Sequence, residues 1–540
     1  MVKISLSSNQ VIVGSALFLT AFANLAFFRN VLAASDTLPG GHIHALSVGA
    51  VLVCTLMLVL SLLCVGRTLK PMLVVLFVLS ACAAYFMDTY NVIIDSDMLT
   101  NVAVTDPAEV RDILTPRLGL YLLLLGILPA VVVLRLPVRP EGLRQALRAR
   151  ALLALSALLG ALALIFLSSG FYASFFREHK ALRYYTNPTT PIYAAYRFIS
   201  RRPTHDPGPP RAIAEDAQRP DKDIDRELVI MVVGETARAD RFSLNGYPRD
   251  TNPRLSKEDV VSFSQVEACG TSTAISVPCM FAIYDRDHFS GGKAAETENL
   301  LDVLVRAGVN VLWRDNNSDS KGVALRVPME DYRSPRTNTL CDLECRDEGM
   351  LVGLQDYIDH HTTGDVLIVL HQLGSHGPAY YKRYPAEFRV FAPTCETNQL
   401  DICTQEEIGN TYDNTILYTD HFLSRVIDLL RANDRGFETA MLYVSDHGES
   451  LGESGLYLHG LPYLIAPDTQ THVPFVVWFG RHYDDVDLSA MRQLRDQPLS
   501  HDNIFHTLLG FFEIRTDVYD PKLDLLQLAR DVAGAQREYQ

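Results

Sequence analysis

The sequence has 540 residues and a formal net charge of −15 at neutral pH. This length predicts more than one domain, and long apolar runs dominate up to about residue 170, whereas a mixed globular composition follows from about residue 215. The negative charge argues against nucleic acid as a partner, because a phosphate backbone attracts a basic surface.

Five apolar runs predict a membrane domain over residues 1–170. A helix needs roughly 20 apolar residues to cross a bilayer. The runs lie near Val11–Phe28, Leu46–Val65, Met72–Phe86, Leu118–Leu136 and Ala151–Leu167. So many runs in one third of a chain favour membrane spans over buried core helices. Because four runs follow the first, we interpret the first as a retained anchor and not as a cleaved signal peptide.

The charges of the loops predict the orientation of these spans. The loop between the fourth and fifth runs carries five arginines against Glu141, and the loop between the second and third carries Arg67 and Lys70. Basic loops stay in the cytoplasm. The loop between the third and fourth runs is acidic, which predicts the opposite side. Five spans that start inside deliver residue 171 onward to that outer side.

Residues 171–224 are rich in aromatic side chains and then in proline. Amphipathic rings favour the interface between membrane and water. We therefore predict one or two interfacial helices followed by an extended linker. Helices that pack on the soluble domain are the alternative interpretation.

Residues 225–540 are predicted to form an α/β domain with a largely parallel sheet. Short apolar runs there alternate with helical patterns such as Tyr412–Leu430, which is typical of buried parallel strands joined by helices. The predicted strands are Leu228–Val233, Val309–Trp313, Val366–Leu370, Ala440–Val444 and Val473–Phe479.

The cysteines of this domain fall into three close pairs. They are Cys269 and Cys279, Cys341 and Cys345, and Cys395 and Cys403. In an oxidising compartment such pairs favour three local disulfides. Zinc binding by thiolates is the alternative, but the sequence has no CxxC pair.

Polar residues follow three of the predicted strands. Glu235 comes after the first, His371 after the third, and the pair Asp446 and His447 after the fourth. Ligands bind beyond the carboxyl ends of the strands in such sheets. One Asp-His pair could be an ordinary surface turn, but three strand ends that offer carboxylate and imidazole indicate a metal site. These ligand types suit Zn²⁺, whereas Ca²⁺ would prefer more oxygens and no imidazole.

A hydroxyl-rich segment, Thr271-Ser272-Thr273, precedes an apolar helical run. Such residues cap helices, and a helix N-terminus offers N–H groups to a phosphate. A hydroxyl bound to Zn²⁺ loses its proton more easily and becomes a nucleophile. The segment therefore offers both a missing oxygen ligand and an attacking group, while simple helix capping is the alternative.

Four motifs together resemble one enzyme family. They are VVGETARADRFSLNGYPRDTNP, CGTSTAISVPCMF, GSHGPAYYKRYP and SDHGESLGE with the later YLHG. The chain resembles the phosphoethanolamine transferases of Gram-negative inner membranes, which include lipid A transferases and mobile colistin-resistance enzymes. They belong to the alkaline phosphatase and sulfatase superfamily. The resemblance implies an alkaline-phosphatase-like (sulfatase-like) α/β catalytic domain after an α-helical membrane domain with five transmembrane helices.

The resemblance also implies roles for individual residues. Zinc would be held by Glu235, Thr273, Asp446 and His447, and Thr273 would be the nucleophile. The remaining residues expected to line the site are His371, His376, His459 and Lys321. Of these, His376 and His459 hold a second zinc in some members, and whether they protonate the leaving group, bind the acceptor or bind metal stays open.

The acidic outer loop carries Asn101, Thr105 and Glu109 at intervals of four residues, which places them on one helix face. The resemblance implies that this face holds the ethanolamine headgroup, although solvated polar residues would give the same spacing. One departure is Ser320, which stands where relatives often have a cysteine before the lysine. It leaves the disulfide pattern around residues 320–345 the least certain.

We therefore expect a monomeric, multi-pass bacterial inner-membrane enzyme with residues 225–540 in the periplasm. It would transfer phosphoethanolamine from phosphatidylethanolamine to lipid A through a phosphoethanolamine-threonine intermediate, and so confer polymyxin resistance. Core sugars of lipopolysaccharide or a periplasmic glucan are alternative acceptors, and a phosphoglycerol-transferring relative is another alternative. A sulfatase would need a C-x-P-x-R or S-x-P-x-R segment, which the hydroxyl run lacks. A non-catalytic scaffold would have lost ligands that are present here.

Overall fold

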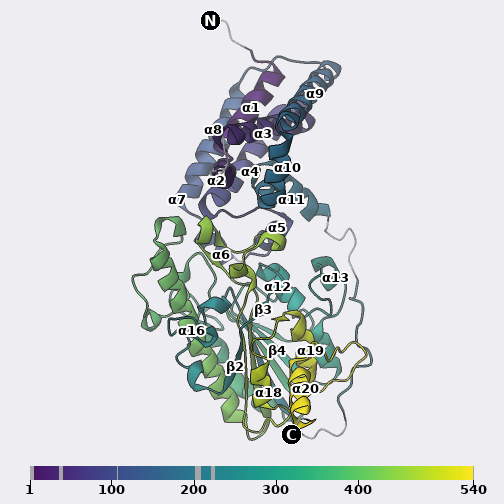
Figure 1. The fold of residues 1–540 in the computed structure, drawn as a ribbon, viewed down its shortest axis with the longest axis vertical. Helices are drawn as coiled ribbons and strands as arrows, with labels where there is room; N and C mark the ends of the chain where they lie inside the picture. The colour runs from purple at the N-terminus through teal and green to yellow at the C-terminus, as the bar shows by residue number, and fades with distance from the viewer. Residues whose placement is uncertain (1–4, 36–40, 106, 201–207, 221–224, 539–540) are drawn as a thin grey trace. The chain divides into compact units, whose positions relative to one another are not determined.

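The computed structural model describes the chain except residues 1–4, 36–40, 106, 201–207, 221–224 and 539–540 (Figure 1). The chain divides into two compact units. We call Met1–Leu99 with Ile113–Ser200 the helical unit, and Thr100–Asp112 with Arg201–Gln540 the sheet unit.

The helical unit contains four helical runs that are long and apolar enough to cross a membrane, and five if one bent pair counts as a single span. The bent pair is α1 (Ser8–Phe22) and α2 (Leu25–Ser35), with a bend of 59° between the two helices. The four others are α3 (Gly41–Leu63), η1 (Gly66–Thr68) with α4 (Leu69–Tyr90), α7 (Pro116–Tyr121) with the π-helical segment η2 (Leu122–Ile127) and α8 (Leu128–Arg135), and α9 (Leu143–Leu167). All five predicted runs fall on these helices, which confirms the predicted membrane domain.

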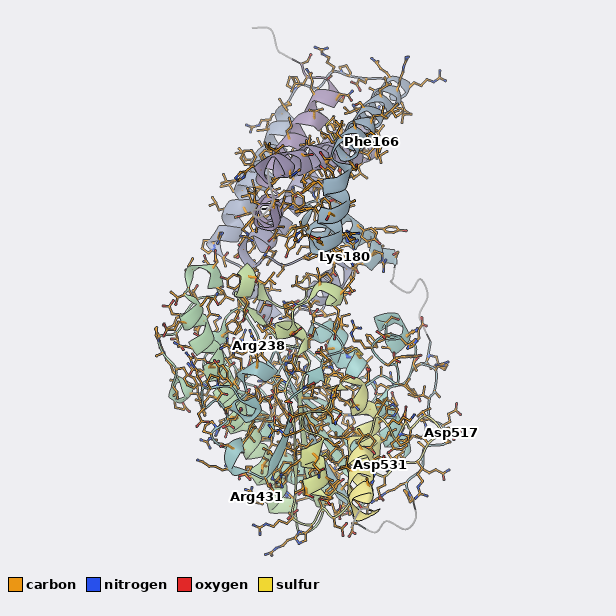
Figure 2. The ribbon with its side chains drawn as sticks, viewed as in Figure 1. Phe166, Lys180, Arg238, Arg431, Asp517 and Asp531 are labelled. Carbon is orange, nitrogen blue, oxygen red and sulfur yellow. A yellow bond between two sulfur atoms is a disulfide. The ribbon has the colours of Figure 1, made fainter. Side chains whose placement is uncertain are left out.

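The outer surface of these helices is apolar. On α9, Phe166, which is labelled in Figure 2, and Leu167 are each 80% exposed. Side chains of this kind are favoured in contact with lipid and unfavourable in contact with water. The exposed apolar surface therefore agrees with membrane-spanning helices.

Two asparagines explain why the first predicted span is broken and not straight. At the bend, the amide of Asn24 donates to the backbone carbonyls of Leu19 at 3.0 Å and Asn187 at 2.7 Å. Asn187 in turn donates to the carbonyl of Ala23 at 2.9 Å. The Ala23 carbonyl at the C-cap of α1 thus bonds to a side chain, whereas the Leu19 carbonyl also keeps its backbone bond from Ala23 at 3.0 Å.

Four short helices and one 3-10 helix complete the N-terminal 200 residues. They are α5 (Ser96–Ala103), α6 (Pro107–Ile113), α10 (Ser169–Glu178), η3 (Lys180–Tyr185) and α11 (Thr189–Ser200). The last three occupy the aromatic-rich segment in which the sequence predicted helices.

A seven-stranded sheet forms the centre of the sheet unit (Figure 1). Its order is β2 (Val260–Phe263), β10 (Phe475–Phe479), β7 (Glu438–Ser445), β1 (Glu227–Gly234), β6 (Val366–His371), β4 (Asn310–Asp315) and β5 (Met329–Asp331). Strand β10 runs antiparallel to both neighbours, and the pairs from β7 to β5 are parallel. The predicted largely parallel sheet is confirmed, and so are its five predicted strands.

Helices cover both faces of this sheet. Val229, Met231 and Val233 of β1 point to one face, and the alternate residues of β1 point to the other. The helices on the first face are α14 (Leu300–Arg306), α19 (Asp502–Phe511) and α20 (Leu525–Glu538), and α16 (Gln405–Asn433) covers the second. This alternation follows from the two-residue period of a strand. The long helix α16 begins at a capping box in which Thr404 and Glu407 satisfy each other's backbone N–H groups.

The remaining helices and two small sheets surround this core. The helices are α12 (Thr273–Met280), α13 (Gly291–Ala295), α14 (Leu300–Arg306), α15 (Leu354–His360), α17 (Asp468–Thr471), α18 (Leu488–Gln493), α19 (Asp502–Phe511) and α20 (Leu525–Glu538). The small sheets pair β3 (Val266–Glu267) with β11 (Leu499–Ser500) and β8 (Ser450–Leu451) with β9 (Tyr457–Leu458).

The three predicted disulfides are present. They join Cys269 to Cys279, Cys341 to Cys345, and Cys395 to Cys403. The first closes the segment that carries Thr273, so the loop before α12 is covalently tied to the helix itself.

Candidate active site

The carboxyl ends of two central strands bring the candidate ligands together. Strands β1 and β7 are parallel neighbours, and Gly234 at the end of β1 lies opposite Ser445 at the end of β7. Glu235 and Asp446 are the next residues of the two strands. Because both strands end at the same edge of the sheet, the side chains of these two residues enter one space.

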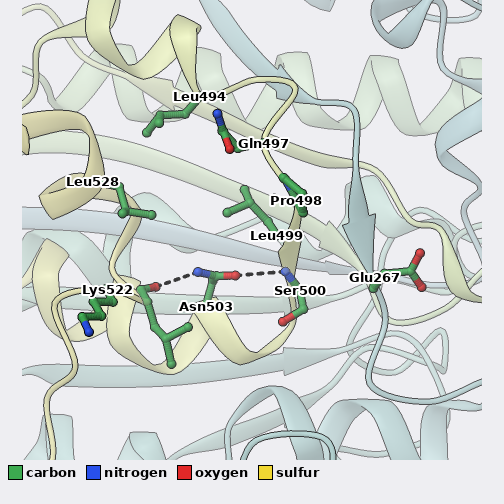
Figure 3. Close-up of a pocket in the computed structure, with 10 residues that line it drawn as sticks. Glu267, Leu494, Gln497, Pro498, Leu499, Ser500, Asn503, Lys522 and Leu528 are labelled. Carbon is green, nitrogen blue, oxygen red and sulfur yellow. Dashed lines mark hydrogen bonds between the residues drawn. The ribbon is translucent and has the colours of Figure 1, made fainter. Parts of the chain in front are cut away.

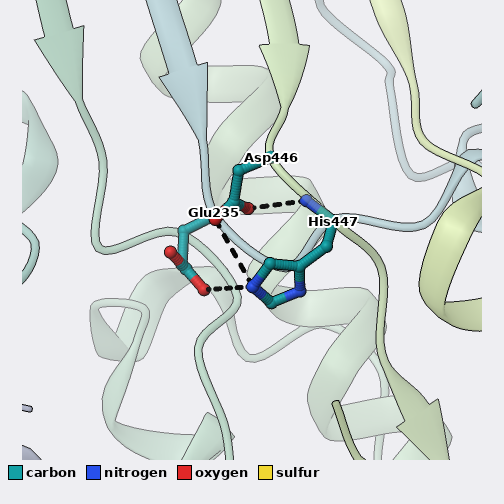
Figure 4. Close-up of side chains that lie close together, drawn as sticks. All are labelled: Glu235, Asp446 and His447. Atoms are coloured by element: carbon teal, nitrogen blue, oxygen red, sulfur yellow. Dashed lines mark hydrogen bonds and ion pairs between the residues drawn. The ribbon is translucent and has the colours of Figure 1, made fainter. Parts of the chain in front are cut away.

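Glu235, Asp446 and His447 form a buried cluster at this edge (Figure 4). One ligand atom from each lies within 4.8 Å of the other two, and all three residues are at most 1% exposed. Nε2 of His447 is 3.4 Å from Oε1 of Glu235 and 3.4 Å from Oδ2 of Asp446. The donor set is thus two carboxylates and one imidazole.

The hydrogen bonds around the cluster leave its inward atoms available to a metal ion. Nδ1 of His447 donates to the Gly448 carbonyl at 2.9 Å, so the lone pair of the neutral ring is on Nε2. Oδ1 of Asp446 accepts from the backbone N–H groups of His447 and Thr236 at 2.8 and 3.1 Å. Oδ2 of Asp446 has no hydrogen-bond partner among the described residues. These residues fit a bound cation.

The charges of the cluster support the same conclusion. The pKa of His447 is lowered to about 3 by burial and then by the charge of His459, while Glu235 opposes the change. Burial, and then the charge of Glu235, raise the pKa of Asp446 well above its usual range. Burial also raises the pKa of Glu235, but the nearby histidines, His447 first, more than offset it and bring the pKa below its usual value. A cation among these atoms would relieve the repulsion between the two carboxylates.

Thr273 lies against this cluster at the first turn of α12. Its Oγ1 donates to Oε2 of Glu235 at 3.0 Å and lies 3.4 Å from Nε2 of His447. The residue is only 4% exposed. Ser272 precedes it as the N-cap, so the hydroxyl stands where the free N–H groups of a helix N-terminus point.

His376 and His459 lie beside the cluster. The ring centroid of His459 is 4.3 Å from that of His447 and 5.7 Å from that of His376. Nδ1 of His459 is 3.4 Å from Oε2 of Glu449, a fully buried carboxylate. The structure therefore brings these two predicted histidines to the cluster of Glu235, Asp446 and His447.

His371 occupies a different environment. Its Nδ1 is 2.9 Å from Oδ2 of Asp315, which also accepts from the indole of Trp313 at 2.9 Å. All three side chains are fully buried. These contacts tie His371 to the end of β4 and to the loop that follows it.

Lys321 reaches the segment of residues 100–112. Its Nζ donates to the Val104 carbonyl at 3.1 Å and to the Ser318 carbonyl at 2.6 Å. Thr105 Oγ1 donates to the Asn101 carbonyl at 2.8 Å. Asn101 and Thr105 therefore lie on the segment that Lys321 contacts, whereas the side chain of Glu109 is outside the described residues.

Sequence reasoning missed two residues that hold Glu235. The amide of Asn317 donates to Oε2 of Glu235 at 2.6 Å, and the hydroxyl of Thr236 donates to Oε1. Thr236 also has a positive φ of 59°, an uncommon conformation for threonine that is typical of functional sites. Its position directly after Glu235 was a usable signal, but nothing in the spacing of Asn317 predicts its partner.

A separate pocket lies at the β3–β11 sheet (Figure 3). Glu267, Pro498, Asn503 and Lys522 are among the residues that line it. Asn503 accepts from the backbone of Ser500 at 2.9 Å and donates to the Leu523 carbonyl at 3.0 Å, so its amide is already engaged. The residues that line this pocket are not those of the Glu235, Asp446 and His447 cluster.

Two family models match the chain. Residues 52–202 match the model described as phosphoethanolamine transferase EptA/EptB, and residues 227–514 match the model described as sulfatase. The two matches cover most of the helical unit and all seven strands of the central sheet.

Individual proteins are similar over most of their length. The phosphoethanolamine transferase EptA of Salmonella typhimurium is 45% identical over 475 residues, which cover 86% of each chain. The phosphatidylethanolamine transferase Mcr-1 of Escherichia coli is 43% identical over 533 residues, 95% of this chain and 96% of that one. The integral membrane lipooligosaccharide phosphoethanolamine transferase A of Neisseria meningitidis has a solved structure with a TM-score of 0.91 and 36% identity, and the match covers 97% of this chain and 99% of that one.

Proposed function

Because the chain belongs to the phosphoethanolamine transferase family, we propose that it moves phosphoethanolamine from phosphatidylethanolamine to lipid A through a covalent intermediate on Thr273. The observation that carries this proposal is the contact of the Thr273 hydroxyl with Oε2 of Glu235 and its approach to Nε2 of His447. A nucleophile that touches two candidate metal ligands has the arrangement that covalent phosphoryl transfer requires.

Glu235, Asp446, His447 and Thr273 would hold one Zn²⁺, since carboxylate, imidazole and hydroxyl donors suit this ion. When bound, Zn²⁺ supplies positive charge that favours the deprotonated hydroxyl and neutralises charge on the phosphoryl oxygens. His376 and His459 are the candidates for a second ion, with Glu449 beside His459.

In the first half-reaction, Oγ1 of Thr273 attacks the phosphorus of the donor lipid. The O–P bond to threonine forms, the P–O bond to diacylglycerol breaks, and the hydroxyl proton passes to Oε2 of Glu235, to which the hydroxyl already donates. With no second ion on His376 and His459, the leaving oxygen takes a proton from this pair. Lys321 would supply positive charge to the equatorial phosphoryl oxygens.

In the second half-reaction, a phosphate of lipid A attacks the phosphorus of the intermediate. The bond to Thr273 breaks, its oxygen regains the proton from Glu235, and the proton of the attacking phosphate passes to the His376 and His459 pair. The product carries a new ammonium group, which lowers the net negative charge of lipid A and weakens its attraction for cationic peptides such as polymyxin.

We place the enzyme in the bacterial inner membrane as a monomer, with residues 225–540 in the periplasm. The apolar helices of the helical unit support a membrane location. The three disulfides support an oxidising compartment for the sheet unit. The meningococcal relative is named for lipooligosaccharide, which supports a glycolipid acceptor.

Intact-mass measurement of the full chain after incubation with phosphatidylethanolamine tests the intermediate. Wild-type protein should gain the mass of one phosphoethanolamine group, and Thr273→Ala should gain none. Thr271→Ala is the matched control, because Thr271 is a nearby buried hydroxyl that donates to the Leu461 carbonyl at 2.7 Å. An adduct on Thr273→Ala would disprove the assignment.

Mass spectrometry of the glycolipids from cells that express the protein tests the acceptor. Phosphoethanolamine should appear on lipid A in cells with the wild-type chain, together with reduced polymyxin susceptibility, and both should be absent with Thr273→Ala. Modification confined to core sugars or to a periplasmic glucan would replace lipid A with that acceptor and leave the first half-reaction as proposed.

A further inference from the structure

Residues 100–112 belong to the sheet unit, although the residues on both sides of them belong to the helical unit. The segment contains the end of α5 and most of α6. It also carries Asn101, Thr105 and Glu109, the proposed headgroup residues. What holds this segment against the sheet unit therefore bears on how the donor lipid is bound.

Asp112 makes the principal attachment at the C-terminal end of the segment. Its Oδ1 pairs with Nζ of Lys382, its Oδ2 lies 3.4 Å from Nη2 of Arg383, and its backbone carbonyl accepts from the amide of Asn398. Asp112 is only 8% exposed. A buried carboxylate is stabilised by such partners. Removing one of them leaves a buried charge without its counterion, which is strongly destabilising.

Arg383 connects this attachment to the active site. Its Nε donates to the backbone carbonyl of His376 at 2.7 Å, and its Nη1 pairs with Glu344. Glu344 lies between the cysteines of the Cys341–Cys345 disulfide. The buried guanidinium of Arg383 thus bonds to Asp112, to the backbone of His376 and to the loop that the Cys341–Cys345 disulfide closes.

The segment is also attached upstream of Asp112. Lys321 donates to the Val104 carbonyl at 3.1 Å, and Val104 lies between Asn101 and Thr105 in the sequence, ahead of α6. Attachments at Val104 and Asp112 enclose the proposed headgroup residues Thr105 and Glu109. A segment fixed at two points loses less conformational entropy when it binds a ligand.

We propose that Asp112, through Lys382 and Arg383, is a positioning residue that holds residues 100–112 beside the active site and thereby sets the affinity for the ethanolamine group of the donor. This inference rests on the proposed function. Asp112 itself does not touch the reacting atoms. Its loss should weaken recognition of ethanolamine and leave the metal cluster and Thr273 unchanged.

Two soluble diesters separate recognition of ethanolamine from chemistry at phosphorus. p-Nitrophenyl phosphoethanolamine carries the ammonium group, and ethyl p-nitrophenyl phosphate is the same diester without it. Both release p-nitrophenolate when Thr273 attacks. The assay uses the zinc-loaded full chain in detergent, with Asp112→Asn and Lys382→Met as the variants.

Asp97→Asn is the matched control. Asp97 is an exposed carboxylate of the same acidic loop, and it accepts from the neighbouring Ser96 at 3.3 Å. The control should keep wild-type kinetics with both diesters.

We expect Asp112→Asn and Lys382→Met each to raise KM for the ethanolamine diester by about tenfold, with kcat within about twofold, as for loss of one coupled interaction. The double variant should be little worse than either single variant, because both remove the same ion pair. Values for ethyl p-nitrophenyl phosphate should not change. Backbone amide exchange in residues 100–112 should become faster in both variants.

Three results would overturn the inference. The first is an unchanged KM for the ethanolamine diester in both variants, even if exchange becomes faster. The second is an equal loss with both diesters, which would indicate a general structural role. The third is full additivity of the two substitutions. Wild-type protein that turned over neither diester would instead refute the proposed function, and this inference with it.

Discussion

Asn317 donates its side-chain amide to Oε2 of Glu235 at 2.6 Å and to the Gln372 carbonyl at 2.8 Å. Its own backbone N–H donates to Oδ1 of Asp315 at 3.0 Å. The loop after β4 therefore orients a candidate metal ligand that extends from β1. Such outer contacts fix the direction of a ligand and the strength of its bond to the metal.

Asn317→Ala should weaken zinc binding by about 10–100-fold and lower transferase activity in proportion at limiting zinc. Competition with a chromogenic chelator measures the affinity. Asn310→Ala is the matched control, because Asn310 begins the same strand and its amide donates to the carbonyls of Thr363 and Asp365 at 3.1 and 3.0 Å. Unchanged zinc affinity in Asn317→Ala would show that Glu235 needs no such support.

Zinc should stabilise the fold, because the cluster that we propose to bind it exists only in the folded chain. A ligand at 100 times its Kd adds about 2.7 kcal/mol to the free energy of unfolding. Thermal unfolding of chelator-treated wild-type protein should therefore shift upward as zinc is added. Asp446→Asn should show a much smaller shift, and Asp517→Asn, a change at an exposed carboxylate (Figure 2), should behave as wild type. An equal shift in Asp446→Asn would remove Asp446 from the metal shell.

Gly374→Ala should damage the site through the backbone of Glu235. Gly374 has a φ of 51°, and a Cβ at this position would lie 2.7 Å from the Glu235 carbonyl oxygen. The conformational strain and the clash should together cost about 1–3 kcal/mol of stability and strongly lower activity. Gly353→Ala separates the two effects, since Gly353 has a φ of 73° and open space around its Cβ. It should lose stability but keep activity, as urea unfolding and the transferase assay can show.

His501 should make the sheet unit sensitive to acid. Burial lowers the pKa of His501 from its usual 6.5 to about 4, and its bond to the Ser445 carbonyl opposes the change. Between these values the unfolded chain binds a proton that the folded chain does not, so stability falls as the pH falls from 6.5 to 4. The loss approaches about 3 kcal/mol for a fully buried ring.

Denaturant unfolding across this pH range measures the contribution of His501. The difference in stability between wild type and His501→Gln should shrink as the pH falls. His360→Gln, a change at an exposed histidine of the same unit, is the matched control. Parallel profiles for wild type and His501→Gln would contradict the prediction.

The central strands could be predicted because each is a continuous apolar run buried on both faces. Two strands of the same sheet, β2 and β5, could not be predicted in this way. Strand β5 has only three residues, none of them buried, and exists because Met329–Asp331 pairs with β4. The bend between α1 and α2 was also hidden, since it depends on Asn24 and Asn187, which lie 163 residues apart. Hydropathy gives no sign of such a long-range pairing.

The residues of the candidate site also divide into those that the sequence could predict and those that it could not. Strand ends in a parallel sheet share one edge, so the proximity of Glu235, Asp446 and His447 followed from a local pattern. The bonds of Asn317 and Thr236 to Glu235 depend on where loops lie after packing, and periodicity carries no information about them. His371 shows the converse: its position after β6 matched the pattern, yet its ring pairs with Asp315 on the neighbouring strand.

The pairing of β1 with β7 has a consequence for maturation. The Thr236 backbone donates to Oδ1 of Asp446 across 210 residues of sequence. A chain that has emerged only as far as β6 contains Glu235 and Thr273 but lacks half of the proposed metal shell. Metal capture therefore requires β7 to have paired with β1, and a metal-loaded molecule is one in which these two central strands are already joined.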